Sequence, residues 1–74
     1  MEYSKELINK IYNDKTISDK IKIEKLLDID CYQYVNSGNT KETRSVVKKN
    51  SIYIYKTIKK IDDYTGCLLI NHLD

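Results

Sequence analysis

Proline is absent from this chain of 74 residues, and glycine occurs only at Gly38 and Gly66. These two residue types are the strongest helix breakers, so long helices can run here without interruption. A chain of this length forms at most one domain, which we take to be residues 1–74, and it buries only a thin core. A binding surface is easier to build on such a core than a deep catalytic pocket. We therefore expect a binding protein rather than an enzyme.

The first part of the chain, residues 1–36, predicts two helices. Ser4 can cap the first, which extends from Tyr3 to about Asn13. Residues 13–16 are typical of a short polar turn. Ser18 can open the second helix, which either runs to Asn36 or breaks near residues 28–30. Apolar residues recur on one face of this helix at helical spacing, namely Ile23, Leu26, Leu27, Cys31, Tyr34 and Val35.

The second part, residues 39–65, predicts two further and shorter helices. Gly38 can end the preceding helix in the left-handed conformation. Asn39 and Glu42 have the spacing of a capping box for a third helix, from Thr40 to about Lys48. Asn50 or Ser51 can then cap a fourth helix that ends within residues 62–66. Its core positions are spaced by four and then three residues, at Ile54, Ile58 and Ile61.

The remaining residues, 66–74, form a short apolar C-terminal tail that can pack back on the helices. A different interpretation exists for residues 52–55, since Ile-Tyr-Ile-Tyr is also typical of a β-strand. Such a strand would pair with residues 67–70 across a turn at Thr65 and Gly66. The apolar positions continuing through Ile58 and Ile61 favour the helix. The expected fold is therefore an all-α, four-helix domain that contains a helix-turn-helix.

Positive charge is concentrated in the third and fourth predicted helices. The formal net charge of the chain is only +2. Within residues 41–60, however, Glu42 is the only acidic residue against seven basic ones, which are Lys41, Arg44, Lys48, Lys49, Lys56, Lys59 and Lys60. An excess of this kind indicates either a surface that binds phosphate groups or simply a solvated helix face.

Two short consecutive helices, the second of them basic, have the layout of a helix-turn-helix. Residues 27–70 resemble this unit in regulators of the PucR/CdaR type, and they are similar to the related units of Fis-type and LysR-type regulators. The matching positions share one register without gaps. They are Asn39, Thr43, Val47, Ile54, Ile58 and Ile61, the segment Ile61-Asp62-Asp63-Tyr64-Thr65-Gly66, and Leu69, with Leu27, Cys31, Tyr34 and Val35 upstream.

Two positions depart from the family pattern. Arg44 stands where the family has a small residue at the helix crossing, and Lys49 stands where it has an apolar residue after the turn. Neither charge can be buried there without a partner. The two helices could be splayed, the two side chains could reach solvent, or the unit could have lost DNA binding. Ser45 could take the crossing if the helix rotates slightly.

The resemblance implies a small, sequence-specific regulator of transcription that places its second helix in the major groove of double-stranded DNA. By position, the residues facing the bases would be Asn50, Ser51, Ile52, Tyr55, Lys56 and Lys59. The residues reaching phosphates would be Lys41, Lys48 and Lys60. Recognition of two half-sites implies a homodimer. The alternative is a helical adaptor or phage-type inhibitor that binds another protein on the same scaffold and no longer binds DNA.

The sequence predicts no cofactor and no metal site. His72 is the only histidine, and the two cysteines, Cys31 and Cys67, lack the paired spacing of a zinc site. No apolar run is long enough to cross a bilayer, and no secretory leader is evident, so we expect no membrane partner. The expected location is the cytoplasm, where both thiols would be reduced.

Overall fold

The computed structural model describes residues 3–36, 38 and 40–72. Four helices make up the fold, and they are α1 (Lys5–Asn13), α2 (Asp19–Asn36), α3 (Lys41–Ile61) and α4 (Asp63–Asn71). The prediction of an all-α domain of four helices is confirmed, but the chain is divided among them differently from the prediction. The described residues contain no strand, so the alternative of a strand at residues 52–55 is wrong.

The first two helices begin and end close to the predicted residues. The Ser4 side chain accepts a hydrogen bond from the backbone N–H of Leu7 and caps α1. The polar turn after α1 is closed by Asp14, which accepts from both the backbone N–H and the hydroxyl of Thr16. Ser18 accepts from the N–H of Ile21 at the start of α2, and α2 continues to Asn36 without a break.

The start of α3 differs in detail from the predicted capping box. Thr40 caps the helix by accepting a hydrogen bond from the N–H of Thr43 at 3.1 Å. The Asn39 cap lies outside the described residues. Gly38 was predicted to adopt the left-handed conformation, but its φ is not positive, so this prediction is wrong.

The predicted turn between Lys48 and Ser51 is not present, since α3 is one helix of 21 residues. Residues 48–51 contain neither glycine nor proline, so nothing in the backbone interrupts the helix. Val47, Ser51, Ile54 and Ile58 are all buried, and their spacing of four, three and four residues places them on one face. Burial of this continuous face against the rest of the molecule stabilises one long helix in place of the two that were predicted.

The predicted apolar tail is mostly helical, and α4 begins immediately after α3. Asp62 caps α4 by accepting hydrogen bonds from the backbone N–H and the hydroxyl of Thr65. Gly66 allows the backbone of α4 to lie directly on α3, since a Cβ there would be 2.5 Å from the backbone nitrogen of Lys59. The segment from Ile61 to Gly66 therefore ends α3 at Ile61 and also starts a new helix, α4, which the sequence did not predict.

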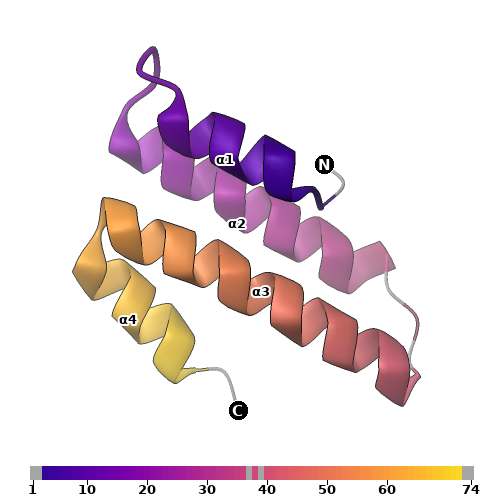
Figure 1. The fold of residues 1–74 in the computed structure, drawn as a ribbon. Coiled ribbons are helices and arrows are strands. Elements are labelled where there is room, and N and C mark those ends of the chain that lie inside the picture. The colour runs from indigo at the N-terminus through magenta and orange to yellow at the C-terminus, as the bar shows by residue number, and fades with distance from the viewer. Residues whose placement is uncertain (1–2, 37, 39, 73–74) are drawn as a thin grey trace.

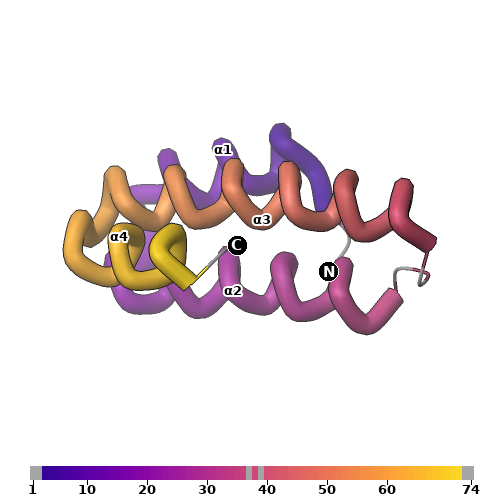
Figure 2. Tube along the Cα trace, turned by 90° about the horizontal axis from the view of Figure 1, so that it is seen from below, coloured from indigo at the N-terminus to yellow at the C-terminus, as the bar shows by residue number. Residues whose placement is uncertain are grey.

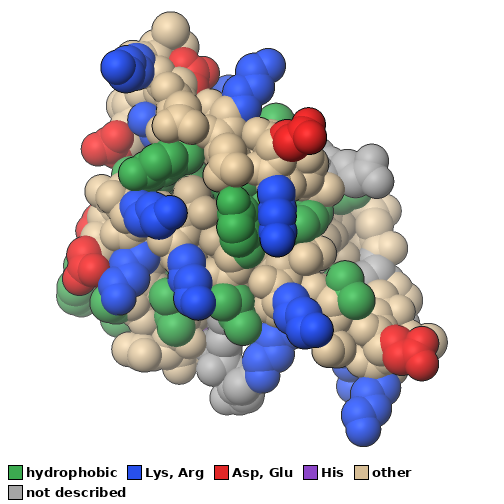
Figure 3. All heavy atoms as spheres, viewed as in Figure 1, with side chains coloured by type: hydrophobic (Ala, Val, Ile, Leu, Met, Phe, Trp, Pro, Cys, Tyr) green, Lys and Arg blue, Asp and Glu red, His purple; other side chains and the backbone are tan. Residues whose placement is uncertain are grey.

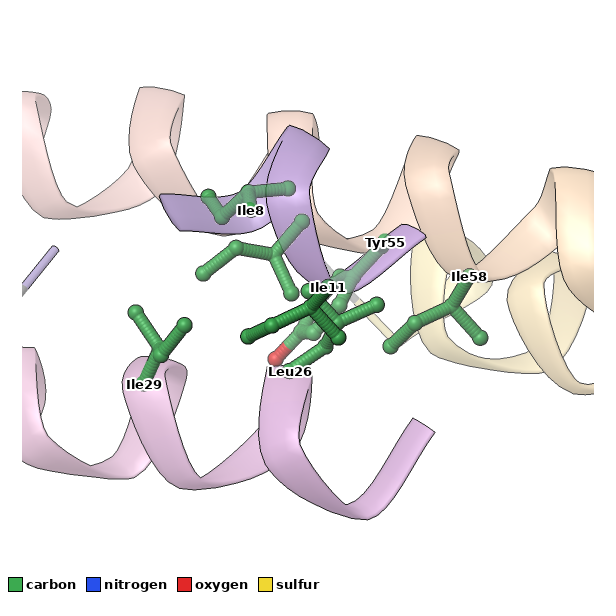
Figure 4. Packing of buried hydrophobic residues seen from close by; sticks show 7 residues of the cluster. Ile8, Ile11, Leu26, Ile29, Tyr55 and Ile58 are labelled. Atoms are coloured by element: carbon green, nitrogen blue, oxygen red, sulfur yellow. The ribbon is translucent and has the colours of Figure 1, made fainter. Parts of the chain in front are cut away.

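The helices form two layers, with α1 and α3 side by side in one and α2 in the other (Figure 2). The chain directions of α1 and α3 are the same, and α4 packs along the C-terminal part of α3 (Figure 1). The main core lies between α1, α2 and α3, where the side chains of the first two helices meet those of the third (Figure 4). Its members are Ile8, Ile11, Leu26, Ile29, Ile54, Tyr55 and Ile58.

Candidate nucleic-acid interface

The solvent side of α3 carries six exposed lysines that we call the lysine face of α3, namely Lys41, Lys48, Lys49, Lys56, Lys59 and Lys60. At 100° per residue, these six positions fall within about 120° of the helix circumference. The buried residues Val47, Ile54 and Ile58 lie on the opposite side of the same helix. Because α3 is unbroken, the lysine face extends over about 30 Å.

Positive side chains are seen along α3 on the face that it shares with α1 (Figure 3). Within the described part of the chain, no lysine of this face forms an ion pair with a carboxylate. The one specific contact is made by Lys60, whose ammonium lies 5.8 Å from the centroid of the Tyr12 ring. Glu42 is the only acidic residue within α3. The charge of the lysine face is therefore left for solvent or for an anionic partner.

Four of the six predicted base-contacting residues have exposed or half-exposed side chains. Lys56 and Lys59 are exposed, whereas Asn50 and Ile52 are intermediate. Ile52 lies between the lysines on the helix circumference. The three predicted phosphate contacts, Lys41, Lys48 and Lys60, are exposed as well.

Ser51 and Tyr55 do not face solvent, and their predicted place among the base contacts is wrong. Ser51 is 0% exposed and Tyr55 is 8% exposed. Both lie on the side of α3 that packs against α2, where their hydroxyl groups bond to Asp30. The predicted register assumed a turn just before Ser51, so it assigned these two positions to the outside of a separate helix.

Asp30 of α2 is the centre of a buried polar network between α2 and α3. Its Oδ1 accepts hydrogen bonds from the Ser51 hydroxyl at 2.5 Å and from the Gln33 amide at 3.0 Å. Its Oδ2 accepts from the Tyr55 hydroxyl at 2.5 Å. The Gln33 amide also donates to Ser51 Oγ and to the Val47 carbonyl. Three side chains of two helices therefore share one carboxyl group.

Burial and the hydrogen bond to Asp30 both raise the pKa of Tyr55 well above its ordinary value of 10.0. Burial is the larger cause, because the phenolate would lose its water on entering this site. The phenol therefore stays protonated and acts as a donor through the whole physiological range. The network is a structural element that fixes the register of α3 on α2 rather than an acid–base site.

Asp30 and Gln33 are not among the residues predicted from the sequence, although the sequence carries a signal for them. The buried face of α2 runs through Leu26, Ile29, Asp30 and Gln33, at the spacing of a helical core face. The apolar pattern of α2 therefore continues into polar residues at the same face. A polar residue in such a position predicts a buried hydrogen-bonding partner.

The two residues that depart from the family pattern do not bury their charges. Arg44 and Lys49 are both exposed, and so is Ser45. The helix crossing at which the resemblance placed Arg44 does not exist, because the predicted pair of helices is one helix. Neither charge therefore requires a partner inside the protein.

Comparison of the chain with protein-family models, with curated protein sequences and with solved structures found no match. Of the features that the PucR/CdaR resemblance implied, the structure supports one, a small four-helix domain. None of the helices in residues 3–36 and 40–72 has the length and apolar character needed to span a membrane. The same residues bring no three potential metal ligands together, and both cysteines are free thiols.

Proposed function

We propose that the protein binds double-stranded DNA through the lysine face of α3. One observation supports this most: six lysines lie on one side of one straight helix, without carboxylate partners in the described part of the chain. Contacts between lysine and phosphate supply most of the affinity of proteins for DNA. A long helix with its cations on one side matches the regular negative charge of a duplex.

The proposed binding differs from the recognition-helix mode that the resemblance implied. Phosphate contacts from the lysine face would position the protein on the duplex. Base reading would be restricted to the predicted residues that remain accessible, which are Asn50, Ile52, Lys56 and Lys59. We therefore expect modest sequence preference, and regulation of transcription is the role that such binding would serve.

The test is fluorescence anisotropy with a labelled duplex of mixed sequence, at several salt concentrations. Each lysine that meets a phosphate contributes about 0.9 to the slope of log K against log salt concentration. The variant Lys49→Ala/Lys56→Ala should lower that slope by about 1.8. The matched control is Lys20→Ala/Lys25→Ala on α2, which removes the same charge elsewhere and should leave the slope unchanged. A wild-type protein that does not bind the duplex at low salt contradicts the proposal.

A second candidate function is association with another protein chain through α4. Tyr64 is 73% exposed and Leu68 is 44% exposed, and their spacing of four residues places them on one face of α4. The backbone of α4, as described, approaches α3 closely but not α1 or α2. Neighbouring exposed apolar side chains on one helix are typical of a contact surface.

The partner in this second candidate is a second copy of the chain, as the expected homodimer requires. Sedimentation equilibrium of the wild type should then give a dimer, and Tyr64→Glu/Leu68→Glu should give a monomer. The control is Ile21→Glu, which introduces a charge at an exposed apolar residue of α2. At a protein concentration of about 100 μM, the experiment detects any dimer with a Kd below about 100 μM. A wild type that remains monomeric at that concentration argues against this candidate.

A further inference from the structure

Two helices, not one, carry the cations on the face formed by α1 and α3. The Lys5 ammonium of α1 lies 5.1 Å from the centroid of the Tyr53 ring of α3. The Tyr53 hydroxyl donates a hydrogen bond to Asn9 Oδ1 at 3.0 Å, which ties the same ring to α1 a second time. At the other end of α1, the Lys60 ammonium lies over the Tyr12 ring.

Tyr53 lies at the edge of the lysine face, in line with three of its lysines. Residues 49, 53, 56 and 60 follow one another at intervals of four, three and four residues. They therefore lie on one strip of α3, within about 60° of its circumference and about 6, 4.5 and 6 Å apart along its axis. Lysine occupies three of these four positions, and Tyr53 occupies the remaining one.

Lys5 supplies a cation at the one position of this strip where α3 itself has none. The ammonium of Lys5 is held over the tyrosine ring by the attraction between a cation and the negative face of an aromatic ring. Within the described residues, it has no carboxylate partner. Lys49, Lys5, Lys56 and Lys60 thus make a row of four positive charges that two helices build together.

We infer that Lys5 is part of the DNA-binding surface, and that Tyr53 positions its ammonium in line with Lys49, Lys56 and Lys60 to meet the phosphate backbone of a duplex. The inference rests on the proposed function and adds α1 to the surface that carries it. An ammonium already held in place loses less conformational freedom when it binds a phosphate, so its contact is more favourable than that of a freely moving lysine.

The first experiment measures duplex binding by fluorescence anisotropy across a salt series for Lys5→Ala. Removal of one phosphate contact should lower the slope of log K against log salt concentration by about 0.9. The matched control is Lys10→Ala. Lys10 is an exposed lysine of the same helix, and together with Lys25 it lines a hollow between α1 and α2. This control should keep the wild-type slope.

The second experiment tests the role of the ring by a double-mutant cycle. Tyr53→Leu should weaken binding when Lys5 is present and should change little in the Lys5→Ala background, because the ring acts through that lysine. Tyr53→Phe keeps the aromatic face and should bind as the wild type does. Circular dichroism melting checks that each variant folds. If Tyr53→Leu does not fold, the result for Lys5→Ala decides the inference.

The outcomes separate this inference from the proposed function. If Lys5→Ala keeps the wild-type slope while Lys49→Ala/Lys56→Ala loses about 1.8, the inference is wrong and the proposed function stands. If the wild type does not bind the duplex at all, both fail. Binding to vesicles rich in anionic phospholipid, without binding to the duplex, would assign the same row of cations to a membrane surface and overturn the inference.

Discussion

The hydroxyl of Tyr55 on α3 donates a hydrogen bond of 2.5 Å to the carboxyl group of Asp30 on α2, a residue that lies 25 positions earlier in the chain. Both side chains are buried. With Ser51 and Gln33, they form a polar network within an otherwise apolar contact between the two long helices. This network orients α3 so that its lysines face solvent, and it therefore connects the stability of the fold with the proposed binding surface.

Replacement of Asp30 by alanine should destabilise the fold by about 3 kcal/mol. The change removes the acceptor that Ser51, Gln33 and Tyr55 share. The Gln33 amide keeps the Val47 carbonyl and Ser51 Oγ as acceptors, but the buried Tyr55 hydroxyl loses its acceptor, and an unsatisfied buried group costs about 1–3 kcal/mol. Urea denaturation followed by circular dichroism measures the free energy of unfolding. The control is Asp28→Ala, at an exposed position of the same helix, which should change stability by less than about 0.5 kcal/mol. Equal effects of the two changes would contradict the structural role of the network.

Stability should decline at alkaline pH because of Tyr55. The pKa of this phenol is raised in the folded protein, first by burial and then by the hydrogen bond to Asp30, whereas in the unfolded chain it is near 10.0. Above pH 10 the folded state therefore retains a proton that the unfolded state has lost, so unfolding becomes more favourable as pH rises. This contribution to stability is complete below pH 10 and is lost as the pH rises toward the raised pKa.

This effect is measured as the free energy of unfolding in urea, for the wild type and for Tyr55→Phe. The measurements run from about pH 8 to 11, a range that begins below the ordinary tyrosine pKa. Lysines also titrate there, so only the difference between the two proteins reports on Tyr55. Tyr55→Phe should be less stable at pH 8 and should show a shallower decline above pH 10. Parallel pH profiles would mean that Tyr55 does not contribute to the alkaline loss.

Gly66 should tolerate no side chain. A Cβ at this position would overlap the backbone of Lys59, so Gly66→Ala forces α4 away from α3. Overpacking of this kind typically costs about 1–3 kcal/mol. Hydrogen exchange should show loss of protection in α4 before the rest of the molecule. In the matched control, Gly38→Ala, the new Cβ would lie 3.8 Å from Thr43 Oγ1, an ordinary van der Waals contact. Similar protection of α4 in both variants would argue against the close approach.

The continuity of α3 through Lys49 can be tested by its tolerance of glycine. Within a helix, glycine costs about 1 kcal/mol relative to alanine. Lys49→Gly should therefore be less stable than Lys49→Ala by about this amount, as measured by urea denaturation. The same pair of substitutions at Lys15, in the turn between α1 and α2, should differ by less than about 0.5 kcal/mol. If glycine and alanine were equivalent at Lys49, a turn would exist at that position.

Local features of the sequence determined where most helices begin and that the lysines face solvent. The helix caps at Ser4 and Ser18 and the turn closed by Asp14 involve partners only two or three residues away. Interactions of this range depend on spacing alone, so they could be predicted without the fold. The exposure of the lysines could be predicted as well, because burying unpaired charges is prohibitively unfavourable.

Contacts between distant residues decided the rest. Residues 48–51 are compatible with either a turn or a helix, and the helix is favoured by burial of Val47, Ser51, Ile54 and Ile58 on one face, where Ser51 bonds to Asp30, 21 positions earlier in the chain. The docking of α4 depends on the fit of Gly66 against Lys59, and the row of cations depends on Lys5 meeting Tyr53, 48 positions away. Such pairings follow from the packing of whole helices, and no local pattern encodes which faces meet. The physical reason is that the free energy of burying a continuous face outweighs the small local preferences for a turn.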